Sequence, residues 1–162
     1  MTLLETIRTI EDAAKMQPSI AMIVENDIFR LNSYADARYG VFAWTQGRHR
    51  GNSDTPEWLR YSFTFFYVDR LRNDIANQVE VQSVGMDVLQ NVLRILRDAG
   101  VEPESYEFQT FNQRFADECA GVYCSVVLAV ENGSDCAETE DGGFRGPDGW
   151  EAAASDVIIR KF

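Results

Sequence analysis

One stretch limits the possible folds more than any other. Residues 58–100 have the pattern of a long aromatic strand followed by the longest helix of the chain. Four aromatic residues of one parity lie in this strand: Tyr61, Phe63, Phe65 and Tyr67. Alternation with a period of two predicts a strand with one face on a core. Phe66 and Val68 make the other face apolar near its end, so we expect a central strand that is covered on both sides there.

The helix that follows is predicted over residues 76–99, where apolar residues recur at helical spacing. Asp74 or Asn77 is expected at its N-cap, and Gly100 should end it. Gly85 within the helix indicates either close approach of another backbone or a tolerated glycine. The predicted core combines this helix with two strands and contains Tyr61, Phe63, Phe65, Val84, Val88, Val92, Val126 and Leu128.

The flanking segments predict an α+β fold. Thr2 and Glu5 have the spacing of a capping box, which begins a short amphipathic helix over residues 3–16. Residues 20–31 favour a hairpin with its turn at Asn26-Asp27. Further strands are expected at residues 38–46, 106–111, 122–130 and 156–162. The prediction is a mostly antiparallel, six- to seven-stranded sheet with a short N-terminal helix and one long central helix packed on it.

The length of 162 residues suits a single domain over residues 1–162. Two surface segments are expected to project from this domain. Residues 47–56 lack an apolar anchor between two long strands, which predicts a projecting loop, and residues 131–151 form a long acidic excursion. No apolar run reaches the roughly 18 residues of a membrane span, and the first residues lack the pattern of a signal peptide. We therefore expect a protein that is intracellular when made and has no membrane partner.

The charge balance argues against specific binding to nucleic acid. The chain has 15 basic and 26 acidic residues, a net charge of −11. Binding to the phosphate groups of nucleic acid depends on clustered Lys and Arg residues. The only basic cluster in the sequence is Arg48-His49-Arg50. His49 is expected to be an exposed loop residue, since no Ser, Cys or carboxylate pattern nearby forms a recognisable site.

Motifs for metal binding and catalysis are not found in the sequence. Cys119, Cys124 and Cys136 are an odd set without C-x-x-C spacing, so free buried thiols are expected rather than zinc, with Cys119 and Cys124 on opposite faces of the sheet. The acidic residues of 131–151 do not match a calcium loop. A phosphate loop, H-E-x-x-H and G-x-S-x-G are all missing, so we predict no enzyme, no cofactor and no metal site.

The order of the expected elements over residues 1–131 resembles that of a known family of proteins. It combines the short helix, the hairpin, two long strands and the long helix with four short strings: Val68-Asp69-Arg70-Leu71, Gln82-Ser83-Val84-Gly85, Phe111-Asn112-Gln113-Arg114-Phe115-Ala116-Asp117 and Ala120-Gly121. Together these resemble small neck and tail-completion proteins of tailed bacteriophages and prophages, which are like tail terminators in architecture. The acidic excursion departs from that compact pattern.

The resemblance implies a structural virion protein in the tail or neck, made in the host cytoplasm. Such a protein forms a homo-oligomeric ring and joins the tail tube to the neck or head connector, and DNA passes through without specific binding. Two alternatives stay open from the residues: a monomeric bacterial adaptor or binding domain, and a small hydrolase or transferase with its site between the 47–56 loop and the long helix. Candidate assembly residues are the basic loop and the terminal strand: Arg48, His49, Arg50, Val157, Ile158, Ile159 and Phe162.

Overall fold

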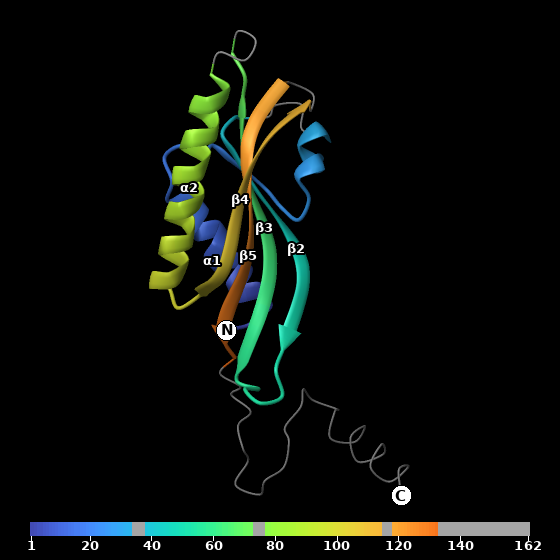
Figure 1. Cartoon of the computed structure of the whole chain (residues 1–162), viewed down its shortest axis with the longest axis vertical. Helices are drawn as coiled ribbons and strands as arrows, with labels where there is room; N and C mark the ends of the chain where they lie inside the picture. Colours follow the sequence, from blue (N-terminus) through green and yellow to red (C-terminus); the bar gives the residue numbers. More distant parts are fainter. Residues whose placement is uncertain (34–37, 73–76, 115–117, 133–162) are drawn as a thin grey trace, which may run out of the picture. The chain divides into compact units, whose positions relative to one another are not determined.

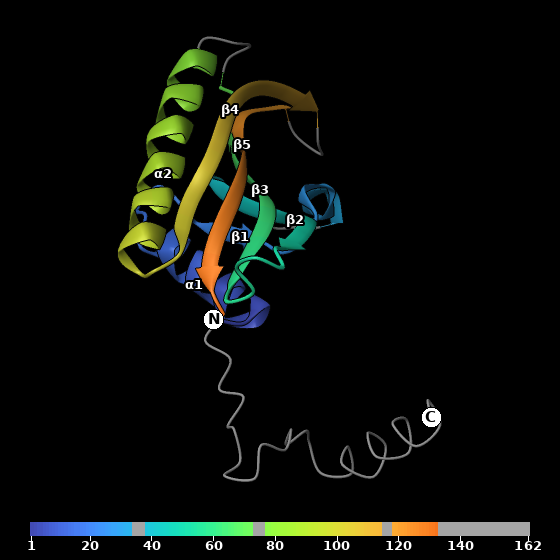
Figure 2. The same ribbon diagram turned by 60° about the horizontal axis from the view of Figure 1, so that its bottom comes forward.

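A computed structural model describes residues 1–33, 38–72, 77–114 and 118–132 (Figures 1 and 2). The chain divides into two units whose residues mainly contact others of the same unit, Met1–Asn132 and Gly133–Phe162. The second unit lies outside the described residues. The single domain, the acidic excursion at 131–151 and the strand at 156–162 therefore stay predictions.

The described residues form one mixed sheet with two α-helices and a 3₁₀ helix, which confirms the α+β class. Its strands are β1 (Met22–Val24), β2 (Val41–Gly51), β3 (Trp58–Arg70), β4 (Glu102–Arg114) and β5 (Glu118–Glu131). The strand order is β1-β2-β3-β5-β4, with β1 parallel to β2 and every other neighbouring pair antiparallel. The prediction of six to seven strands is not matched, because the described residues contain five.

The hairpin predicted over residues 20–31 is wrong. β1 is followed by Asn26 at φ 61° and by the 3₁₀ helix η1 (Ile28–Ser33) rather than by a returning strand. The Asp27 carboxylate accepts the backbone N–H of Phe29 at 2.8 Å, a local bond that favours a helical turn. The short β1 then pairs in parallel with β2, where Met22 faces Val41.

Local signals placed the two α-helices well. α1 (Leu3–Lys15) begins at the predicted capping box, in which Glu5 N–H donates to Thr2 Oγ1 at 3.2 Å and Thr2 N–H donates to Glu5 Oε2 at 2.6 Å. α2 (Gln78–Asp98) follows Asn77, and Gly100 at φ 85° lies just beyond it. The Asn77 side chain does not cap α2. It bonds instead to the backbone N–H of Arg72 at 2.8 Å and the carbonyl of Arg70 at 3.3 Å, which ties the start of α2 to the end of β3.

Both α-helices lie on the same face of the sheet (Figure 2), and the main core is between them and the strands. All predicted core residues are buried except Val84, which is 36% exposed. Gly85 takes the position that faces the sheet: a Cβ there would lie 2.8 Å from Tyr67 Cδ1. The close approach at Gly85 is therefore that of a side chain, and no backbone is needed to explain it.

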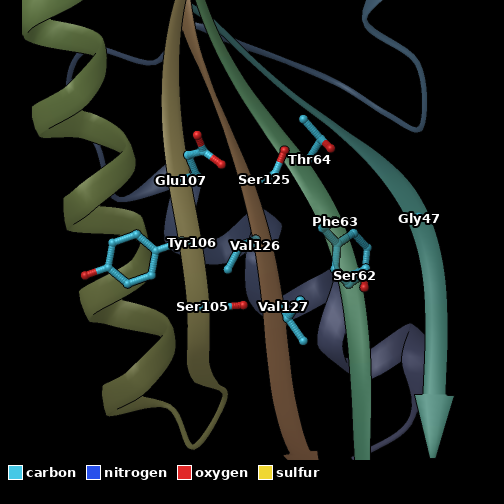
Figure 3. Close-up of a pocket in the computed structure, with 10 residues that line it drawn as sticks. All are labelled: Gly47, Ser62, Phe63, Thr64, Ser105, Tyr106, Glu107, Ser125, Val126 and Val127. Carbon is cyan, nitrogen blue, oxygen red and sulfur yellow. The ribbon is translucent and has the colours of Figure 1, made fainter.

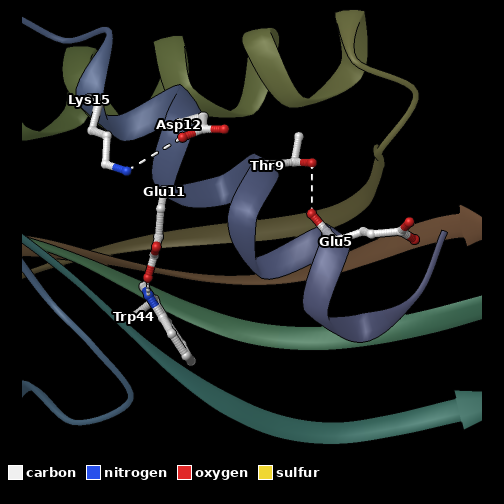
Figure 4. A network of polar contacts seen from close by, with 6 residues as sticks. All are labelled: Glu5, Thr9, Glu11, Asp12, Lys15 and Trp44. Carbon is white, nitrogen blue, oxygen red and sulfur yellow. Dashed lines mark hydrogen bonds and ion pairs between the residues drawn. The ribbon is translucent and has the colours of Figure 1, made fainter.

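A partly buried polar bond joins α1 to the sheet (Figure 4). Trp44 Nε1 of β2 donates to Glu11 Oε1 of α1 at 3.1 Å. Trp44 is only 5% exposed, so this bond satisfies an indole N–H that would otherwise be buried without a partner. The other contacts drawn on α1, between Lys15 and Asp12 and between Thr9 and Glu5, are exposed and stay within the helix.

A smaller core covers one end of the opposite face. Ile28 and Leu31 of η1 pack there with Val41, Val68 and Cys119. This confirms that the aromatic strand is covered on both sides near Val68. Cys119 lies in this core and Cys124 in the main core, and both are free and buried, as predicted. Cys136 lies outside the described residues.

Burial of Tyr67 makes a pH-dependent contribution to stability. Loss of water around its phenol, helped by the neighbouring Asp69 carboxylate, raises the pKa of Tyr67 from 10.0 to about 12. The folded protein therefore keeps this proton to a higher pH than the unfolded chain does. The contribution is complete below about pH 10 and is lost as the pH rises towards about 12. We expect wild-type stability to fall more steeply across that window than that of Tyr67→Phe, as measured by urea unfolding; parallel curves would contradict this.

Candidate assembly surface

Beyond η1, the sheet face opposite the α-helices carries no covering element among the described residues, and we call this part the outer face. It contains a shallow trough of about 470 Å³ that crosses β2, β3, β5 and β4 (Figure 3). Most of its lining side chains are small or hydroxylic: the lining residues are Gly47, Ser62, Phe63, Thr64, Ser105, Tyr106, Glu107, Ser125, Val126 and Val127. An antiparallel sheet commonly leaves one face of this polar kind to solvent or to a partner.

The alternation of β3 and β5 explains why the outer face is polar. Phe63 and Phe65 point to the main core, so Ser62 and Thr64 between them point outward. In β5, Val126 pairs with Phe63 and is buried, which leaves Ser125 on the outer face opposite Thr64. These small side chains offer little apolar surface against which a helix could pack.

The two sides of the outer face carry opposite charges. On the β2 side, Arg50 lies opposite Arg60 of β3. Arg60 Nε reaches across the sheet to Glu104 Oε2 at 2.7 Å, so its charge is matched. Arg50 is exposed and makes no ion pair with another described residue. On the β4 side, Glu107 is exposed and, in the described part of the chain, equally without an ion pair.

Among the described residues, the edge of the sheet at β4 is long and has no further strand beside it, and we call it the open edge. β4 has 13 residues and pairs with β5. Tyr106 in it is 49% exposed, and its ring lies 5.7 Å from that of Phe108. Beside this edge, Tyr106 and side chains of α2 that include Arg94 and Arg97 line a second hollow of about 350 Å³. Arg97 is paired with Glu102 at 3.4 Å.

The structure corrects the extent of the predicted loop at 47–56. β2 continues to Gly51, so Arg48, His49 and Arg50 belong to a strand and only residues 52–57 connect it to β3. An irregularity between Gln46 and His49 lets the ladder continue, with His49 opposite Tyr61. The His49 ring lies edge-on to Tyr61 at 5.1 Å, an anchor that composition alone did not reveal. His49 is exposed, as expected, and its Nε2 is 3.1 Å from Gln46 Oε1.

Of the seven candidate assembly residues, only the first three can be placed. Arg50 lies beside the trough, whereas His49 faces the α-helix side of the sheet with Tyr61. The terminal four, Val157, Ile158, Ile159 and Phe162, lie outside the described residues. Sequence reasoning missed the outer face. Its one local signal was the alternation of Ser62 and Thr64 with the aromatic residues.

The described residues offer few groups for metal binding or catalysis. They hold no group of three or more His, Cys, Asp or Glu side chains that could bind a metal ion. Burial raises the pKa of the Cys124 thiol to about 12, so this cysteine is protonated at neutral pH and is a poor nucleophile. Within the same residues, no helix is both long and apolar enough to cross a membrane.

No protein-family model matches the chain, and no curated protein matches its sequence.

Proposed function

We propose that this protein is a structural component of a phage virion, a ring-forming neck or tail-completion protein of the tail terminator type that joins the tail to the head connector. Two kinds of observation support the proposal. The first is the resemblance of residues 1–131 in element order and short strings. The second, which carries it, is the open edge of β4.

An unpaired edge strand presents a row of free N–H and C=O groups to other chains, and monomeric proteins usually block it with proline, bulges or charge. In β4 the proline and the bulge lie at the start, whereas an exposed charge, Glu107, lies further along. At the start, Pro103 and a register shift between Pro103 and Ser105 lie beside Glu102 and Glu104. The stretch from Ser105 onward keeps a regular ladder with β5 and carries the exposed Tyr106. This stretch suits addition of an extended segment from a neighbouring subunit of a ring.

The net charge of −11 fits the same role. A ring of such subunits carries a strongly negative field, and a channel of that sign repels the phosphates of DNA. DNA would then pass through without being held, and no specific nucleic-acid contact is needed.

The proposal is tested by measuring the mass and shape of the full chain. We expect light scattering after size-exclusion chromatography to give a multiple of the subunit mass, and electron microscopy to show closed rings, alone or with the tail-tube and connector proteins. Tyr106→Lys with Thr110→Lys places two charges on the open edge and should convert most of the assembly to monomers. Val79→Lys on the exposed side of α2, where Val79 is 76% exposed, is the matched control.

The outcomes separate the alternatives. Normal melting of the double-lysine variant with loss of rings supports assembly through β4. A wild-type protein that stays monomeric at every concentration, and binds neither the tail-tube nor the connector protein, overturns the proposal and favours an adaptor domain.

A further inference from the structure

From the charges of the outer face, we infer that two copies of this chain associate with their outer faces together, so that Arg50 of each copy meets Glu107 of the other. The inference does not rest on the proposed function, because it uses the outer face and not the open edge of β4. The occupant of the trough is a second copy of the same surface.

The first step is that the two charges lie on one face. Arg60 and Ser62 point outward because Tyr61 and Phe63 point to the main core. Arg50 is opposite Arg60, and Glu107 is opposite Ser125, which in turn is opposite Thr64. Arg50 and Glu107 therefore both belong to the outer face, at its opposite margins, with the trough between them.

The second step is that both charges lack a partner within the described part of the chain, whereas their neighbours are matched. Arg60 is bound to Glu104 at 2.7 Å, and Glu102 is bound to Arg97 at 3.4 Å. An unmatched positive group and an unmatched negative group on one surface make that surface complementary to itself. A two-fold axis can bring each onto the other, and two equal contacts then form at once.

The third step is geometric. Three strand spacings separate β2 from β4, about 14 Å in total. Along β3, the levels of Arg50 and Glu107 correspond to Arg60 and Thr64, four residues or about 13 Å apart. The line between the two charges thus runs at about 45° to the strands, and exchanging its ends by a two-fold axis crosses the strands of the two sheets at about 90°. Orthogonal crossing is one of the two common ways in which sheets pack face to face.

The fourth step concerns the surface between the charges. The midpoint of that line falls near Ser62 and Val127, which face each other across β3 and β5. The trough side chains around it are mostly small and carry hydroxyl groups that can bond across the contact, and the Arg60–Glu104 ion pair crosses the sheet next to them. Figure 3 labels Ser62 and Thr64 on β3 and Ser125 on the neighbouring β5.

The test is a charge exchange in the full chain. Arg50→Glu places two acidic groups together in the face-to-face pair, and Glu107→Arg places two basic groups together. Each variant alone should self-associate about tenfold to a hundredfold more weakly than the wild type by analytical ultracentrifugation. An equimolar mixture of the two variants restores both contacts, one with its original sign and one with reversed sign, and should recover association close to that of the wild type.

The matched controls are Arg8→Glu on α1 and Asp87→Arg on α2, which reverse exposed charges on the two α-helices, away from the outer face. They should associate as the wild type does, alone and mixed. A wild type that is monomeric throughout, or single variants that associate like the controls, overturns the inference, as does a mixture that fails to recover. Single variants that keep their rings but no longer pair through the outer faces support the inference and identify the edge of β4 as a separate contact. Single variants that keep both the rings and the face-to-face pairing overturn the inference while leaving the proposed function standing.

Discussion

Replacing Phe65 with alanine is expected to lower the free energy of unfolding by about 3–5 kcal/mol. Phe65 is fully buried, and its ring lies 5.6 Å from that of Phe42 and 6.1 Å from that of Phe63. It belongs to β3, which has strand neighbours on both sides, so the surrounding structure cannot collapse easily into the space left by the ring. Urea unfolding followed by circular dichroism measures the loss, and Phe63→Ala should behave similarly.

Val84→Ala is the matched control, because Val84 was expected in the core but is 36% exposed on α2. Its truncation should cost less than about 1 kcal/mol. If both phenylalanine variants lost under 1 kcal/mol, the aromatic residues of β3 would not be packed as the structure shows.

Gly121→Ala is the second large effect. A Cβ at this position of β5 would collide with the carbonyl oxygen of Tyr67 and would lie 2.8 Å from Phe111 Cζ. The first of these atoms belongs to the backbone of the neighbouring strand, which cannot turn aside as a flexible side chain can. We expect a loss of about 3 kcal/mol or more, at the upper end of overpacking effects, or failure to fold.

The control for this substitution is Gly51→Ala at the end of β2. There a Cβ meets only Leu59 Cδ2, at an ordinary 3.5 Å. This variant should stay within about 0.5 kcal/mol of the wild type. Equal thermal melting of the Gly121 and Gly51 variants would show that β3 and β5 do not approach each other as closely as described.

The elements that sequence reasoning found are those defined by local patterns. The parity of Phe63 and Phe65 located the buried face of β3, the capping box at Thr2 located the start of α1, and Gly100 located the end of α2. Each depends on residues a few positions apart, which the sequence displays directly.

The elements that it missed depend on partners distant in the chain. β1 has three residues and exists as a strand through its parallel pairing with β2. The continuation of β2 through Arg48 depends on β3 to supply the opposite strand, and His49 finds Tyr61 only across that ladder. The same limit applies to the candidate surface. Arg50 and Glu107 are separated by 57 positions, and nothing local indicates that they share a face.

The strand order also bears on how the chain reaches its native state. The ladder between β2 and β3 and the ladder between β4 and β5 each join segments that are close in sequence. The ladder between β3 and β5 joins Trp58 to Glu131 and Arg70 to Cys119, with α2 and β4 between them in the chain. Closing such long loops costs more conformational entropy than closing a hairpin. We therefore expect two hairpins to form early and the central ladder to form late, so the longest antiparallel pairing in the sheet is also the rate-limiting one.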